Sequence, residues 1–161
     1  MSIKLPIRQK GFTLIELLVV IGILAVLLAI TLIAINPARQ FSQANNTKRS
    51  SDVNSILNAV HQYAADNKGV ITALGIGTSP TPISDAVGGV GDGFCTALVT
   101  EYIAALPADP LTGGGANITD TLCIAGSWNT GYTIIRSAAD NRITVSAPQT
   151  ELGLPAISVT R

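Results

Sequence analysis

The sequence predicts an α+β fold, in which a long bent N-terminal helix packs on a small antiparallel sheet of three or four strands. An unbroken apolar run covers residues 12–35, and an amphipathic helical pattern follows it to residue 68. Short β-branched runs then fill the last third of the 161 residues. Because such a helix and such a sheet each have one apolar face, packing one on the other buries both faces.

The apolar run is long enough to cross a membrane. From Phe12 to Ile35 it has 24 residues and a single charge, Glu16. As a helix with a rise of ~1.5 Å per residue it would span roughly 36 Å, enough for a bilayer. The apolar region of a secretory signal is shorter and is removed by a cut on its far side. Here the run is followed by Asn36 and Pro37, without a small-residue cleavage site.

A basic leader, residues 1–11, precedes the run. Its basic residues are Lys4, Arg8 and Lys10. The stretch KGFTLIELLVV, residues 10–20, resembles the class III signal of type IV pilins and type II secretion pseudopilins. The resemblance implies a type IV pilin-like fold, cleavage between Gly11 and Phe12 by a prepilin peptidase, and N-methylation of the new Phe12 amine. It also implies that residues 12–35 are kept as membrane anchor and filament core. About a quarter of the chain is covered by it.

Glu16 needs a partner, because a carboxylate in a membrane helix costs on the order of 2–3 kcal/mol. After cleavage Phe12 would carry a cationic amine, and residues four apart share a helix face, so the pair could neutralise itself within one chain. The resemblance implies instead that Glu16 pairs with the Phe12 amine of a neighbouring subunit and sets the axial register. The alternative is that Glu16 snorkels to the cytosolic headgroups.

Charge gives little support for nucleic acid as a direct ligand. The whole chain has ten basic and ten acidic residues, and without the leader it has seven and ten, 7 − 10 = −3. Basic residues lie on both sides of the apolar run, so the positive-inside rule does not decide the orientation of the span in the membrane. The resemblance implies that the leader lies in the cytoplasm, so we expect a single-pass inner-membrane precursor. The mature protein would then join an extracellular or periplasmic filament.

Residues 36–68 are expected to continue the helix. Pro37 removes a backbone donor and clashes with the carbonyl of Ile33, which predicts a kink. The alternative is a break between two separate helices at the membrane exit. Gly22 is a second weak point. We expect residues 38–49 to be solvated, and Gly69 to end the helix as its left-handed cap. One apolar face should lie on the globular head: Val53, Ile56, Leu57, Val60, Tyr63 and Ala64.

The head should comprise residues 69–161 and begin with a variable surface loop, residues 69–93, that is rich in glycine, serine and proline. A weak helical pattern at residues 94–106 ends at Pro107. The strands are expected in the C-terminal region, residues 121–160. The β-branched runs are Gly131–Arg136, Arg142–Ser146, Ala156–Thr160 and, as a candidate fourth, Thr121–Ile124.

Cys95 and Cys123 are the only cysteines and define a predicted disulfide region, residues 95–123. An exported chain favours a disulfide, which would close a loop of about 29 residues and stabilise by roughly 3–4 kcal/mol. Two unpaired buried thiols are the alternative.

The segment Leu106–Pro110, LPADP, is similar to one that precedes a calcium-binding loop in major pseudopilins. Asp109 and Asp120 are therefore weak candidates for calcium ligands, although Asp109 suits a turn equally well. We expect no other cofactor.

No catalytic motif was found, so the expected function is structural. The resemblance implies a pilin that forms a helical filament with copies of itself, after processing by prepilin peptidase, on an inner-membrane platform with an assembly ATPase. The first alternative is a pseudopilin of a type II secretion or competence (DNA-uptake) system. The second is a single-span membrane-anchored binding domain that does not polymerise.

Overall fold

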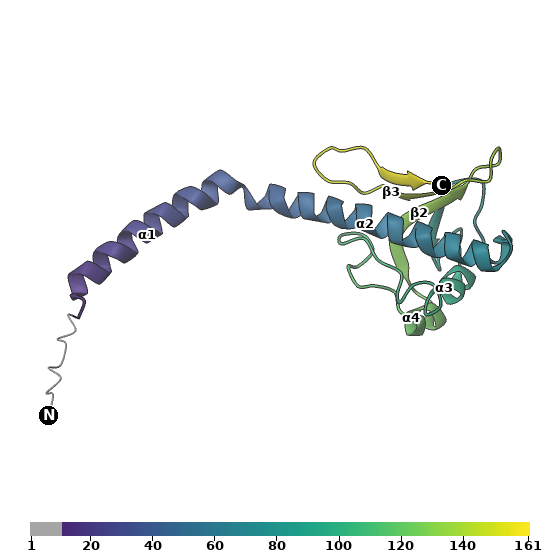
Figure 1. Ribbon diagram of the computed structural model, residues 1–161, viewed down its shortest axis with the longest axis horizontal. Helices are drawn as coiled ribbons and strands as arrows, with labels where there is room; N and C mark the ends of the chain where they lie inside the picture. The colour runs from purple at the N-terminus through teal and green to yellow at the C-terminus, as the bar shows by residue number, and fades with distance from the viewer. Residues whose placement is uncertain (1–10) are drawn as a thin grey trace, which may run out of the picture. The chain divides into compact units, whose positions relative to one another are not determined.

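The computed structural model describes residues 11–161, so the basic residues of the predicted leader lie outside the described part of the chain. The chain divides into two units, of which the first ends at Gln40 and the second runs from Phe41 to Arg161 (Figure 1). The first unit is essentially one apolar helix. The second unit, the head, holds the sheet and the core.

The first two helices are α1, Leu14–Ile35, and α2, Pro37–Asp66, and a single residue separates them. Asn36 ends α1 in the left-handed region, with φ 46° and ψ 79°. Its backbone oxygen and its Oδ1 accept from the Arg39 N–H at 3.1 and 3.3 Å, so it also caps α2. Pro37 becomes the first residue of α2, where no N–H is needed. The predicted kink at Pro37 is therefore a one-residue break, and α1 is continuous through Gly22.

The end of α2 differs from the prediction by one residue. The Gly69 N–H bonds the Ala64 carbonyl at 2.7 Å, and the Lys68 N–H bonds the Ala65 carbonyl at 3.4 Å, which is the Schellman pattern. The left-handed cap residue is therefore Lys68, with φ 54°, and Gly69 follows it at φ 83°.

The head has a four-stranded antiparallel sheet in the order β1-β2-β3-β4 (Figure 1). The strands are β1 Thr81–Ser84, β2 Asn129–Arg136, β3 Ile143–Ala147 and β4 Ile157–Thr160. The α+β class and the last three strands are confirmed. The fourth strand is β1, which lies inside the predicted loop, and Thr121–Ile124 is helical.

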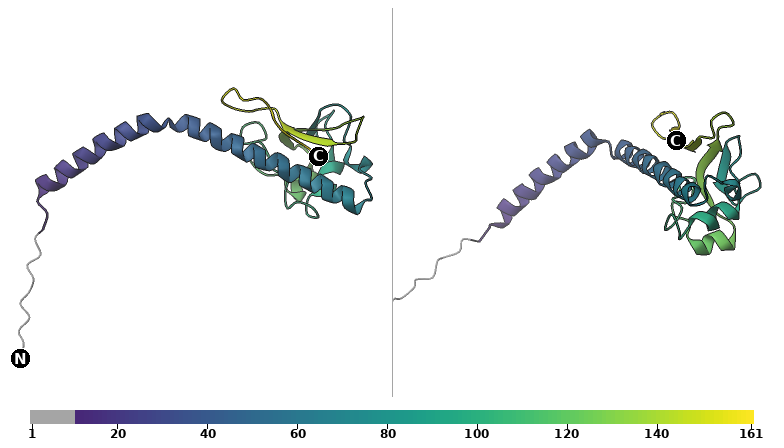
Figure 2. Two further views of the ribbon diagram at one scale, coloured as in Figure 1. Left: turned by 45° about the horizontal axis from the view of Figure 1, so that its top comes forward. Right: turned by 45° about the vertical axis from the view of Figure 1, so that its right-hand side comes forward.

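Within the head, α2 runs beside the sheet (Figure 2), and its apolar face is part of the hydrophobic core. Val53, Ile56, Leu57 and Val60 are fully buried against the inner faces of β2 and β3. Complete burial of such a side chain stabilises by roughly 1.5–3 kcal/mol, so this face fixes the second half of α2 on the head. The predicted helix face is confirmed at these positions.

Two short helices complete the head, α3 Asp92–Leu98 and α4 Asp120–Ala125, with a 3₁₀ turn, η1, at Thr72–Leu74. α3 and α4 lie side by side (Figure 2). α3 is shorter than predicted, because Val99 is extended and Thr100 has φ 75°, which stops the helix well before Pro107.

Candidate assembly site at the start of the apolar helix

The predicted cleavage site lies just ahead of α1. Gly11 and Phe12 are exposed and precede the helix, which begins at Leu14. A Cβ added to Gly11 would meet no described atom within 4 Å. The described chain therefore sets no steric requirement for glycine at this position.

Thr13 and Glu16 form a capping box. Thr13 is the N-cap of α1, and its Oγ1 accepts from the Glu16 N–H at 3.3 Å. In return, Glu16 Oε2 accepts from the Thr13 N–H at 2.8 Å and from Thr13 Oγ1 at 2.7 Å. This pair was not predicted from the sequence, although a threonine three residues before a glutamate at the start of an apolar run is its usual signal.

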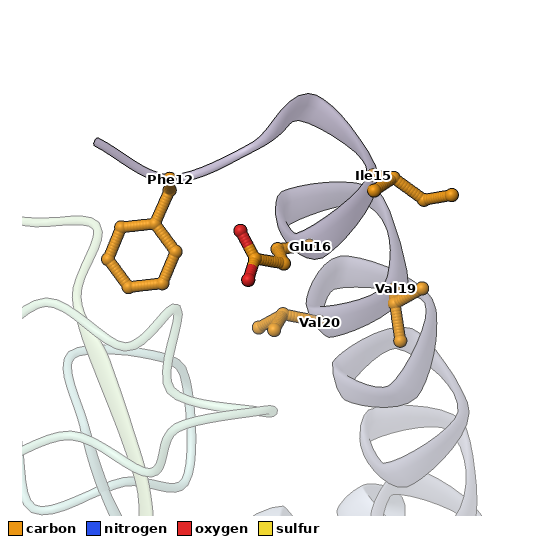
Figure 3. Close-up of a pocket in the computed structure, with 5 residues that line it drawn as sticks. All are labelled: Phe12, Ile15, Glu16, Val19 and Val20. Carbon is orange, nitrogen blue, oxygen red and sulfur yellow. The ribbon is translucent and has the colours of Figure 1, made fainter. Parts of the chain in front are cut away.

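One carboxylate oxygen of Glu16 remains open. Within residues 11–161, Glu16 Oε2 receives both donors from Thr13, and Oε1 has no hydrogen-bond partner. The carboxylate points toward Phe12 and Val20, while Ile15 and Val19 lie on the other side of the helix (Figure 3). These five residues line a surface hollow of about 350 Å³. The only charge of α1 thus lies exposed beside apolar side chains, with room for another donor.

The surface of α1 has no cover. The helix has no buried residue, and its large apolar side chains are all at least half exposed. Among the described residues, Leu14–Ile35 is the one helix whose length and composition suit a membrane crossing. Leaving so many large apolar side chains in water would cost roughly 1.5–3 kcal/mol each, so α1 requires lipid or other helices around it.

Cys95 and Cys123 meet in the head. The structure joins them as a disulfide between α3 and α4, with Cα atoms 5.5 Å apart and both residues fully buried. The second cysteine lies in a helix and not in the strand expected for it.

The two calcium candidates are not brought together around a cation site. Asp120 is exposed at the start of α4. Asp109 is fully buried, and its Oδ2 accepts from Arg49 Nε at 2.6 Å. Its Oδ1 accepts from the N–H groups of Leu111 and Thr112, each at 2.9 Å. In the described part of the chain no three acidic, histidine or cysteine residues are grouped for a metal ion.

Asp109 is a structural anion. Burial alone would raise its pKa, but the hydrogen bonds from Arg49 and from the N–H groups of Thr112 and Leu111 outweigh that effect and lower the pKa to about 2. Its buried charge is compensated, because Arg49 Nη2 adds a second bond to Oδ1 at 3.3 Å. The LPADP turn is thereby tied to α2.

Arg49 corrects the expectation of a solvated stretch at residues 38–49. Its side chain is fully buried, and besides Asp109 it binds Glu151 Oε2 and Asn46 Oδ1, each at 2.9 Å from Nη1. Glu151 also accepts from Asn45 Nδ2 at 2.9 Å. The helical spacing contained the signal, because positions 42, 46, 49, 53, 56 and 60 lie on one face of α2.

Residues 7–32 match the family model of the prokaryotic N-terminal methylation motif. This motif is the prepilin signature of type IV pilins and pseudopilins. The chain therefore carries the signature of a type IV pilin- or pseudopilin-like precursor, which implies processing by prepilin peptidase and assembly in a pilus system. Together with α1, the motif fits a membrane-anchored precursor. No curated protein and no solved structure matches the chain.

Proposed function

We propose that the chain is a pilin, the structural subunit of a type IV pilus-like filament, and that it is not an enzyme. In this proposal prepilin peptidase cleaves after Gly11, and the new amine of Phe12 is methylated. The mature chain then joins copies of itself on an inner-membrane platform driven by an assembly ATPase. The observation that carries the proposal is the prepilin motif, with Glu16 as the only charge of an uncovered apolar helix.

The geometry around Glu16 supports its role in register. The capping box holds the carboxylate at the start of α1, because Thr13 supplies two donors to Oε2. Oε1 stays open toward the surface of α1 and can accept from the Phe12 amine of a neighbouring subunit. A charge pair surrounded by apolar helices is little screened, so a neighbour displaced along the axis would leave both charges unpaired.

The exposed surface of α1 supports burial in a helical bundle. In the precursor, lipid covers the helix. In the filament, helices of neighbouring subunits replace lipid around the same side chains. The head, whose core is complete without α1, would face outward.

The second candidate is a pseudopilin of a type II secretion or competence system. The Leu106–Pro110 segment favours it, because it is similar to the segment found in major pseudopilins. Surface filaments seen by electron microscopy would favour the pilus. A secretion or DNA-uptake defect in cells without surface filaments would favour the pseudopilus. A membrane-anchored binding domain that does not polymerise would keep its leader and tolerate loss of Glu16.

The decisive experiment separates register from capping. Glu16→Gln removes the charge, whereas Thr13→Ala removes the capping box and leaves the carboxylate. We expect cleaved and methylated Glu16→Gln protein that stays in the membrane, and Thr13→Ala protein that still appears in sheared filaments. Mass spectrometry of the membrane fraction and of the sheared filaments measures cleavage and methylation, and the fraction in which each variant is found reports its assembly. Normal filaments from Glu16→Gln, or equal defects in both variants, would contradict the register role.

A further inference from the structure

A second hollow lies in the head, and the proposed filament function does not use it. It has a volume of about 400 Å³ and is lined by the end of α2 and by the β2–β3 turn. Its polar lining residues are His61 of α2, Arg136 at the end of β2, and Asn141 in the turn. No acidic residue is among its lining residues.

Two buried nitrogens in this hollow lack a partner. Nε2 of His61 and Nε of Arg136 are buried and make no hydrogen bond within residues 11–161. No other buried side-chain nitrogen or oxygen of the described chain is in this situation. Nε of Arg136 always carries a hydrogen, and a buried donor without an acceptor destabilises the fold, so an acceptor is missing beside it. Nε2 of His61 is a second donor in the protonation states in which it carries the hydrogen.

The sheet places a row of side chains under α2 at this point. Arg136 is paired with Ile143 across β2 and β3, and Ile143 exchanges backbone hydrogen bonds of 2.8 and 3.0 Å with Arg161. Directly opposite residues of an antiparallel sheet project to the same face. Ile143 is buried on the α2 side, and Arg161 Nη1 donates to Asn58 Oδ1 of α2 at 2.8 Å. Two guanidinium groups therefore flank Ile143 beneath the helix.

The charge of Arg136 has no carboxylate partner within residues 11–161. The acidic residue of the β2–β3 turn, Asp140, is bound by Arg142, with 3.3 Å between Oδ2 and Nε. The hollow therefore combines a permanent positive charge with two nitrogens that face no acceptor.

We propose that this hollow binds an oxyanion, a phosphate or carboxylate group, through Arg136 and His61. Arg136 donates from Nε–H and contributes the permanent charge, and His61 donates from Nε2 when that atom carries the proton. The oxyanion comes either from a small molecule in the medium or from an acidic group on a second copy of the chain. Both sources present the same oxygen atoms to the same donors.

Inorganic phosphate is the probe for the first source. Full-length ¹⁵N-labelled protein in detergent micelles is titrated with phosphate at constant ionic strength, and the side-chain resonances of arginine and histidine are followed by NMR. We expect a saturable shift of Arg136 and His61, and an apparent Kd at least about tenfold weaker in Arg136→Gln, which loses a charge-assisted bond. Arg142→Gln is the matched control, because it removes the same charge at the other end of the β2–β3 turn, from a guanidinium already paired with Asp140.

Protein concentration tests the second source. If the Arg136 and His61 resonances move as the protein is concentrated in phosphate-free buffer, and Arg136→Gln abolishes the movement, a second copy supplies the oxyanion. A response to phosphate that does not saturate, together with no concentration dependence, would overturn the proposal. So would equal weakening in Arg136→Gln and Arg142→Gln. Thermal unfolding checks each variant, and His61→Gln replaces Arg136→Gln if the latter does not fold.

Discussion

Replacing Arg49 by methionine tests the buried ion pair between α2 and the LPADP turn. The substitution keeps most of the side-chain volume but leaves Asp109, which is fully buried, without its cation. Removing one partner of a buried pair costs about 3–5 kcal/mol. Glu151, whose side chain is 22% exposed, loses the same partner but can be hydrated, so it adds less. We expect the free energy of unfolding to fall by about 3–5 kcal/mol.

The loss of folding stability at acid pH gives a second, independent measure of the Arg49–Asp109 pair. The pKa of Asp109 falls from 3.8 to about 2 in the folded chain, which corresponds to about 2 kcal/mol of stabilisation. Because the folded pKa lies below the unfolded value, this stabilisation is complete above about pH 4 and is lost as the pH falls toward 2. Glu151, whose pKa is also lowered by Asn45 and Arg49, loses stabilisation in the same direction. In Arg49→Met this acid loss should shrink.

Urea unfolding of the full-length protein in detergent, followed by tryptophan fluorescence, measures both effects. Trp128 is the only tryptophan and is 3% exposed in the head, so it reports on this unit. Arg39→Met is the matched control, since it loses the same charge from an exposed position of α2 and should change stability by less than about 0.5 kcal/mol. Adding Asp109→Asn to Arg49→Met should regain stability. A loss below about 1 kcal/mol, or an unchanged acid slope, would refute a structural ion pair.

Three further changes have defined outcomes. Gly131→Ala places a Cβ 2.6 Å from Thr112 Oγ1 at a φ of +77°, so urea unfolding should show a loss of about 2–4 kcal/mol; wild-type stability would contradict the close packing. Gly11→Ala should leave the stability of the head unchanged, because the described chain does not require glycine there, but it should block cleavage by the proposed peptidase. Intact-mass measurement distinguishes the cleaved from the uncleaved chain. Replacing Cys95 and Cys123 by alanine opens a 28-residue separation and should cost roughly 3–4 kcal/mol by chain entropy, checked against the reduced wild type.

The elements predicted correctly are those whose structure depends mainly on local sequence patterns. Residues 12–35 form one apolar run with the single charge of Glu16, and the apolar residues from Val53 to Val60 all lie on one face of a helix. The alternating runs around Ile134 and Val145 likewise suit half-buried strands.

The missed elements depend on partners distant in the chain. β1 has four residues and contains Pro82, so its pattern resembles a turn. It becomes an edge strand because β2 supplies its pairing, with an irregularity between Pro82 and Ser84. The run Thr121–Ile124 has β-branched residues, yet Cys123 is joined to α3 and the segment packs there as helix.

The candidate site shows the same division. The prepilin motif around Glu16 was identified through the resemblance of residues 10–20 to a known family, whereas the capping box with Thr13 could be found by spacing alone. The burial of Arg49 could not be inferred from its charge, because arginine is usually exposed unless paired, and its partner Asp109 lies 60 residues further on. The hollow beside Arg136 could not be predicted either, because it depends on the sheet register and on the position of α2 together.

The contacts of Arg49 also determine the order in which the head can be completed. Its partners lie 60 and 102 residues later, at Asp109 and Glu151. In a chain anchored by α1 and translocated from that end, Arg49 is exported early and Glu151 follows 102 residues later. Until both acids arrive, the guanidinium stays hydrated and the first part of α2 remains unattached to the head. In the proposed pilin topology, export of the chain as far as Glu151 therefore precedes closure of this helix, and a chain stalled in transit presents a loose α2 to proteases.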